Sequence, residues 1–425
     1  MPPSTSQHAQ YQQIVDSFGE AVAPGPHDWE QTGVHYLHEA SHLLVREEYL
    51  DAVASALAAH GTVCRPRVRP TVRGVVLVEL SQAEGDRRAP LGCAEALRLV
   101  ETGEVPGREG RVSPLGHGVV APNHLIGICE TATICPANEP SPVPPGTAPY
   151  PGRAADPGTG EGVKVVVADT GLDHATAART PWLTGVTGDP DPGVHDGTID
   201  KYAGHGTFIA GVLRCVAPAA TVQVRNVFPP RSPIGNGGFA FESDVVPVLE
   251  DILRNDEPDI ISLSAGTWAQ DNHILLTIEA FFANRLRHHK GVLLVSAAGN
   301  DHFRKPFWPA AAPFAVSVGA LGTTWREHAE FTAFGGWVDV YAPGTDLVNA
   351  FPSGTYTYRE PPNSGSTQFQ GMARWSGTSF STPVVAGLVA ARMSRTGENG
   401  VTAAARLLDQ ARAQAKPGVG AVLVP

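Results

Sequence analysis

The sequence predicts an α/β protein in which a small α/β sandwich precedes a mostly parallel sheet with helices on both faces. Three observations carry this prediction. Strand-like and helix-like patterns follow one another twice within residues 35–103. After residue 160, short apolar strands alternate with helix-like segments. Between the two parts, residues 104–160 are rich in proline and glycine, which is typical of a linker.

The composition excludes several classes of protein. Of 425 residues, 42% are hydrophobic, which is enough for a sizeable core. The net charge of −11 argues against a partner that is nucleic acid or an anionic membrane. Five cysteines are too few for a disulfide scaffold. The first twenty residues lack the basic and apolar regions of a secretion signal. We therefore expect a cytoplasmic protein, with export by a non-standard route left open.

The N-terminal part is expected to form one small unit. Residues 1–34 are polar and aperiodic and predict an extension. For residues 35–103, we expect strands at His42–Arg46 and Gly74–Leu80, and helices at Glu47–His60 and from Gly92 onward. Residues 104–160 predict a linker, because the many prolines of 140–157 oppose a regular element.

Residues 161–425 are expected to form the larger domain. Its β-rich runs are Val163–Asp169, Thr221–Val227, Asp259–Ser264, Val292–Ala298 and Phe314–Leu321. Its helix-like segments are Ser243–Asn255, Asn272–Lys290 and Thr382–Ser394. Nearly continuous apolar strands predict a parallel sheet that is covered on both faces. Ligands of such sheets bind beyond the carboxyl ends of the strands, so we expect the chemistry there.

Four polar residues stand at these strand ends and helix starts, in the order Asp169, His205, Asn300 and Ser379. Ser379 opens an apolar helix, whose N-terminus favours developing negative charge. A serine nucleophile needs a base, a group that orients the base, and donors for the oxyanion. Each residue alone has an ordinary explanation as a turn or a helix cap. Together they predict a site for nucleophilic catalysis.

The motifs around these residues resemble those of the subtilisin-like serine peptidases, the subtilase family. The matching segments are VVVADTGLD, HGTFIAGV, VSAAGN and SGTSFSTPVVAG, and the resemblance covers roughly residues 160–415. It implies a subtilisin-like fold and a serine endopeptidase with a protein or peptide as substrate. As in subtilisin, it implies that Ser379 is the nucleophile, His205 the general base, Asp169 the orienting carboxylate and Asn300 the oxyanion donor.

The resemblance also implies that a substrate binds as an extended strand between two enzyme segments. The implied residues are Ser264, Ala265 and Gly266 on one side, Gly237 and Gly238 on the other, and Ala298 and Gly299 on a wall of the S1 pocket. Glycine-rich turns without a binding role are the alternative. Phe307 stands where relatives often have a small residue at the floor of S1, which implies a preference for small or medium side chains.

Two further expectations rest on the resemblance. The segment after His205 lacks room for the family's common calcium loop, so we expect that site to be absent and no cofactor to be required; other calcium sites stay open. The N-terminal unit resembles, in pattern only, the family's inhibitory propeptide, a ferredoxin-like sandwich that blocks the active site. Intramolecular inhibition and cleavage within residues 104–160 would follow. An unrelated regulatory or docking domain is the alternative.

Other short motifs and other uses of the same residues suggest alternative functions. Residues 38–42 (HEASH) match a zinc-peptidase pattern, but a strand is expected there and a third ligand is not evident. Residues 169–171 (DTG) match an aspartic-peptidase motif, but no other Asp-Thr/Ser-Gly supplies the second carboxylate. Two alternatives use the same triad positions: a catalytically silent binding module, and a peptide ligase or cyclase. Product masses separate the last of these from a hydrolase.

Overall fold

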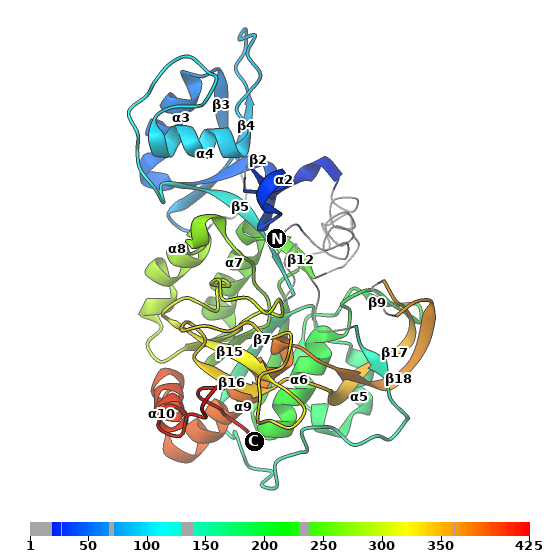
Figure 1. The fold of residues 1–425 in the computed structure, drawn as a ribbon. Helices are drawn as coiled ribbons and strands as arrows, with labels where there is room; N and C mark the ends of the chain where they lie inside the picture. Colours follow the sequence, from blue (N-terminus) through cyan, green and yellow to red (C-terminus); the bar gives the residue numbers. More distant parts are fainter. Residues whose placement is uncertain (1–18, 27, 68–71, 129–138, 229–237, 360–362) are drawn as a thin grey trace.

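The structure is a computed structural model, and it describes residues 19–26, 28–67, 72–128, 139–228, 238–359 and 363–425. A small N-terminal unit sits at one end of a larger α/β domain, and strand β5 runs from the first into the second (Figure 1). Within the described ranges, no helix combines the length and apolar character needed to cross a bilayer.

The larger domain is built on a seven-stranded parallel sheet with the order β16-β15-β14-β13-β7-β11-β8. The strands are β7 (Lys164–Asp169), β8 (Thr187–Gly188), β11 (Thr221–Asn226), β13 (Ile260–Leu263), β14 (Leu293–Ala297), β15 (Ala315–Leu321) and β16 (Val340–Pro343). All five expected strands are present, and the predicted fold class is confirmed.

Helices cover both faces of this sheet. On β7, Val165 and Val167 belong to one apolar core, and Val166 and Ala168 belong to the other, because successive side chains point to opposite faces. The first face carries α6 (His205–Val216), α9 (Thr378–Thr396) and α10 (Gly400–Ala413), and the second carries α7 (Glu242–Asp251) and α8 (Leu276–Asn284). The short α5 (His174–Arg179) follows β7. The sheet is therefore buried on both sides, as its apolar strands predicted.

The N-terminal unit has the element order βαββαβ. Its elements are β2 (Tyr36–Arg46), α3 (Leu50–Ala58), β3 (Thr62–Pro66), β4 (Val75–Gln82), α4 (Cys93–Thr102) and β5 (Val120–Gly127). The antiparallel sheet order β5-β2-β4-β3 is that of a ferredoxin-like sandwich. Both helices pack on one face, where Leu57 and Leu97 share a core with Leu43 and Val78. Before this unit, β1 (Val22–Gly25) pairs with β2, and α2 (Trp29–Thr32) follows β1.

The stretch predicted as a linker needs a correction, because β5 lies inside residues 104–160 and completes the N-terminal sheet. Its sequence, VAPNHLIG, hides the strand, since a proline and two polar residues interrupt the apolar run. Those two polar residues, Asn123 and His124, are buried because the larger domain supplies their partners.

A smaller sheet with the order β6-β18-β17-β10-β9 lies beside α6 and was not predicted. Its strands are β6 (Ser141–Pro142), β9 (Val194–His195), β10 (Thr198–Ile199), β17 (Leu347–Thr357) and β18 (Ser366–Trp375). Just before β6, the buried carboxylate of Glu139 accepts hydrogen bonds from the Tyr356 hydroxyl (2.9 Å) and the Arg359 backbone N–H (3.0 Å). The chain from Glu139 onward is thus anchored to the larger domain.

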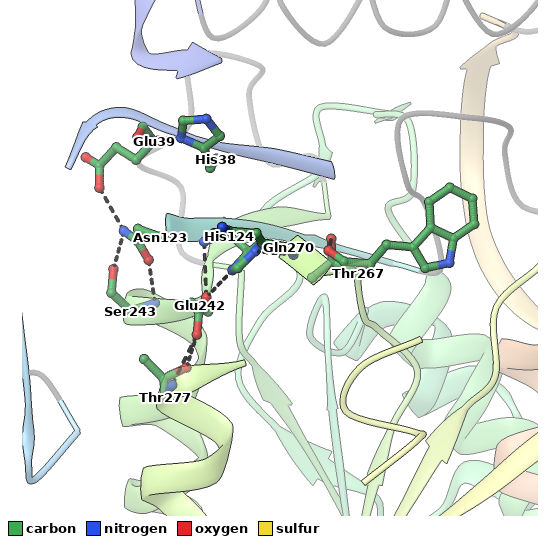
Figure 2. Close-up of polar contacts among 10 residues, drawn as sticks. His38, Glu39, Asn123, His124, Glu242, Ser243, Thr267, Gln270 and Thr277 are labelled. Carbon is green, nitrogen blue, oxygen red and sulfur yellow. Dashed lines mark hydrogen bonds and ion pairs between the residues drawn. The ribbon is translucent and has the colours of Figure 1, made fainter. Parts of the chain in front are cut away.

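A buried polar network joins the two parts of the molecule (Figure 2). The Glu242 carboxylate, at the start of α7, lies 2.7 Å from Nδ1 of His124 and accepts the Thr277 hydroxyl at 2.6 Å. On the other side of the ring, the backbone N–H of Gln270 donates to Nε2 of His124 at 3.2 Å. Asn123 donates to Glu39 at 2.8 Å and to Ser243 at 2.9 Å. Partners inside the interface therefore satisfy its buried polar groups.

Candidate active site

Asp169 and His205 meet at the carboxyl edge of the sheet. Asp169 is the last residue of β7 and His205 the first of α6, and both side chains are buried. Nδ1 of His205 lies 2.8 Å from Oδ1 of Asp169, which also accepts the Thr170 backbone N–H at 2.8 Å. This contact holds the imidazole with Nε2 facing away from the carboxylate. The geometry suits a histidine that exchanges protons through Nε2.

Ser379 lies in the first turn of α9, and its backbone carbonyl accepts a hydrogen bond from outside the helix. Pro383 has no N–H, so the carbonyl four residues earlier, that of Ser379, lacks its usual helical donor. The Ser264 hydroxyl donates to this carbonyl at 2.9 Å instead. Because Ser264 directly follows β13, the bond ties the start of α9 to the strand edge.

Asn300 stands beside this helix start with one amide hydrogen-bonding group in use. Its Oδ1 accepts the Thr378 backbone N–H at 2.9 Å and the Thr378 hydroxyl at 3.0 Å. Its Nδ2 is buried without a hydrogen-bond partner among the described residues. A Cβ built on Gly377 would lie 3.5 Å from this Nδ2. A fixed, unpaired donor next to Ser379 is what an oxyanion requires.

Aromatic side chains enclose the imidazole. The ring centroid of His205 lies 5.2 Å from that of Trp375 and 5.2 Å from that of Phe380. Since Phe380 follows Ser379, this packing brings the start of α9 next to His205. Neither aromatic residue stood out in the sequence, because a contact across the fold leaves no local pattern.

The end of β5 runs between the two segments that were predicted to bind a substrate strand. Gly127 and Gly266 exchange both backbone hydrogen bonds, at 3.1 and 2.9 Å, in an antiparallel bridge. On the opposite edge, Leu125–Gly127 pairs with β12 (Phe239–Phe241), and the N–H of Ile128 donates to the Gly238 carbonyl at 2.9 Å. Gly237 lies outside the described residues. The protein's own chain therefore lies in this cleft as an added strand.

Phe307 fills the space between two of the predicted pocket walls. A Cβ built on Gly266 would lie 2.4 Å from Cε1 of Phe307, and one built on Gly299 would lie 3.3 Å from Cγ of the same ring. The ring is 1% exposed. Two backbone hydrogen bonds of 2.9 Å between Trp308 and Thr267 fix the next residue. The neighbouring Ala298 donates to the Val318 carbonyl at 3.0 Å, which holds the second wall on β15.

The residues that match the zinc-peptidase pattern do not lie on a helix. The HEASH segment lies on strand β2, so its two histidines do not have the helical spacing of a zinc peptidase. In the described part of the chain, His, Cys, Asp and Glu side chains form no group of three placed to hold a metal ion.

A parallel α/β sheet with a paired Asp–His, a helix-borne serine and a free amide donor at its carboxyl edge defines a site of the serine-peptidase type. Residues 160–419 match the model of the subtilase family of peptidases, and the chain belongs to that family. The resemblance inferred from the motifs is thereby confirmed.

Individual relatives agree with this assignment. M-protease of Shouchella clausii is 28% identical over 242 residues, which are 55% of this chain and 54% of M-protease. Subtilisin Savinase of Lederbergia lenta is 28% identical over 242 residues, or 55% of this chain and 76% of that protein. The match thus spans about half the length of M-protease.

One solved structure extends the similarity into the N-terminal unit. Fervidolysin from Fervidobacterium pennivorans, a keratinolytic enzyme related to subtilisin, has a TM-score of 0.57 and 18% identity, and covers 91% of this chain and 60% of its own. At this identity the similarity concerns the fold alone.

Proposed function

We propose that this protein is a serine endopeptidase that hydrolyses peptide bonds through an acyl-enzyme on Ser379. The observation that carries the proposal is the 2.8 Å contact between His205 Nδ1 and Asp169, next to a buried and unpaired Asn300 amide. In the proposed reaction, Oγ of Ser379 attacks the substrate carbonyl while Nε2 of His205 takes its proton. Asn300 Nδ2 donates to the oxyanion, and His205 returns the proton to the leaving amine.

The second half of the reaction uses the same groups. His205 takes a proton from a water molecule, the resulting hydroxide attacks the acyl carbonyl, and Ser379 recovers its proton as the acid product leaves. Asp169 remains ionised throughout, holds the imidazole in one tautomer and stabilises its charged form. No step in this proposal needs a cofactor, so activity is expected to survive a chelator.

Labelling with a fluorophosphonate, followed by peptide mapping, tests the proposal. We expect the adduct on Ser379, its loss in S379A, and unchanged labelling in EDTA. The control is S353A, which removes an equally small hydroxyl from the β17–β18 hairpin. A folded, processed protein that fails to react with the probe would favour the catalytically silent module. With a peptide substrate, a product mass that contains an added amine instead of water would identify a ligase.

We further propose that the N-terminal unit inhibits the site until the chain is cut. The support is the position of Gly127 and Ile128, which pair with Gly266 and Gly238 as a substrate strand would. In an antiparallel pair, each step forward on one strand is a step back on the other. Ser264, which contacts Ser379, lies two residues before Gly266. The residue opposite Ser264 is therefore two residues after Gly127, so we expect residue 129 to donate the carbonyl that Ser379 attacks.

Self-cleavage is therefore expected between Cys129 and Glu130, a bond outside the described residues. N-terminal sequencing of the large fragment should begin at Glu130, and S379A should stay intact. If the processed enzyme is active but its N-terminus lies outside residues 128–132, the proposed mode of inhibition is wrong while the peptidase proposal stands.

A further inference from the structure

A buried carboxylate outside the motifs lies behind the Asp169–His205 pair. Asp191 is 5% exposed and belongs to the segment after β8. Its Oδ2 accepts the backbone N–H of Gly204 at 2.7 Å and the Thr170 hydroxyl at 3.0 Å, and its Oδ1 accepts the Gly193 N–H at 3.0 Å. The two carboxylate oxygens thus have three donors.

These bonds reach the backbone on both sides of His205. Gly204, immediately before the histidine, donates to Asp191 directly. Gly206, immediately after it, donates to the Thr170 hydroxyl at 3.1 Å, and that hydroxyl donates to Asp191. Thr170 is itself the neighbour of Asp169. One hydrogen-bonded chain therefore links the segment that carries the aspartate to the backbone N–H groups of the residues before and after the histidine.

The backbone around His205 needs such support. Gly204 has a φ of +82°, in the left-handed region, and as a glycine it has no side chain with which to cap α6. Gly206 lies so close to Gly171 that an added Cβ would be 2.5 Å from the Gly171 carbonyl oxygen. Asp191 is in turn fixed, because its N–H donates to the Leu172 carbonyl at 3.1 Å. The position of the imidazole thus depends on contacts that hold its backbone.

The charge of Asp191 lowers the stability of the fold. Burial raises its pKa to about 6, and the negative charge of Asp169 on β7 acts in the same direction. Its three hydrogen-bond donors, two backbone N–H groups and a hydroxyl, lower the pKa but do not offset the burial. Above that pH the folded protein therefore holds an ionised carboxylate at an unfavourable position. A side chain that served stability alone would not need this charge.

We infer that Asp191 and Thr170 are positioning residues for His205, which hold the imidazole in line between Asp169 and Ser379. The inference rests on the peptidase function proposed above. Both side chains are buried, so neither is open to a substrate. Their effect is expected on the chemical step, because a small displacement of the base weakens proton transfer while it leaves substrate contacts intact.

The test measures kcat per active site, with sites counted by fluorophosphonate titration, for D191N, T170V and T170S. We expect kcat to fall 10- to 100-fold in D191N and T170V with KM nearly unchanged, and T170S, which keeps the hydroxyl, to recover most of it.

The matched control is D256N, because Asp256 is also a buried carboxylate but binds Arg225 and Gln223 away from the histidine. D256N should lower the unfolding temperature and leave kcat per site unchanged. If D191N behaves in the same way, Asp191 is only structural and the inference is wrong. If wild-type enzyme reacts with the probe but T170V keeps its full kcat, the inference also fails while the peptidase proposal stands.

Discussion

At the scale of single residues, the fixed amide of Asn300 leads to a direct prediction. Replacing Asn300 by alanine should lower kcat by about 10²–10³, because one oxyanion donor is lost. KM should change little, since the donor acts mainly on charge that develops in the transition state. Steady-state kinetics on the processed enzyme measures both values. A kcat within a factor of three of wild type would show that the amide is not used.

The ring of Phe307 predicts which side chains the substrate carries before the cleaved bond. Because the ring fills the space between Gly266 and Gly299, peptides with Gly, Ala, Ser or Cys there should be cut best. F307A should gain at least tenfold in kcat/KM for a Phe or Leu peptide relative to an Ala peptide. F282A is the control, since that ring stacks on Phe314 instead. A wild-type enzyme that prefers Phe would contradict this prediction.

The sequence was informative about single residues where a short motif carries them. Asp169, His205 and Ser379 each lie in such a motif, and the structure places the first two within hydrogen-bonding distance. Asp191 could not be found in this way. Its partners Gly204 and Thr170 are distant from it in the sequence, and no local motif indicates that the fold brings them together. A carboxylate in a Pro-Asp-Pro loop is ordinarily read as a turn residue.

At the scale of elements, β5 fits its cleft only because Gly238 has no side chain. A Cβ at Gly238, where φ is +63°, would lie 2.5 Å from Cδ1 of Ile128. G238A should therefore displace the strand and slow self-cleavage at least tenfold, measured by gel densitometry of the full chain over time. G107A is matched, since its φ is +76° and the space around it is open. Equal rates of self-cleavage in both variants would show that the position of β5 does not affect processing.

Elements were predictable where one chemical pattern dominates. β13, β14 and β15 were expected because they are continuous apolar runs, and they are fully buried. The β17–β18 hairpin was missed, since polar residues interrupt its apolar runs and its second half, after Pro352, is only partly buried. β5 was missed for a different reason: its polar residues are matched by groups of the other domain.

At the scale of the whole molecule, His38 makes the joint between the two units sensitive to acid. Burial lowers the pKa of His38 to about 4, and His124 nearby acts in the same direction. A histidine whose pKa is lower in the folded than in the unfolded state stabilises the fold at pH values above about 6.5. This contribution is lost as the pH falls toward 4. The loss is on the order of 3 kcal/mol.

We therefore expect the unfolding temperature of the uncut S379A chain to fall between pH 7 and pH 4, with a smaller fall in H38Q. His195 is largely exposed, so H195Q is the control and should follow S379A. Differential scanning calorimetry measures all three. Identical slopes in H38Q and S379A would assign the acid sensitivity to other groups.

The anchoring of Glu139 has a consequence for how the inhibitory unit would be released. Ten residues separate Ile128 from Glu139, a tether that spans roughly 35 Å at most. While the chain is uncut, a dissociated N-terminal unit would rebind the active site at an effective concentration on the order of millimolar. Cleavage of one peptide bond within the tether makes this rebinding intermolecular. The fraction of inhibited enzyme would then depend on the protein concentration, and dilution would activate the enzyme.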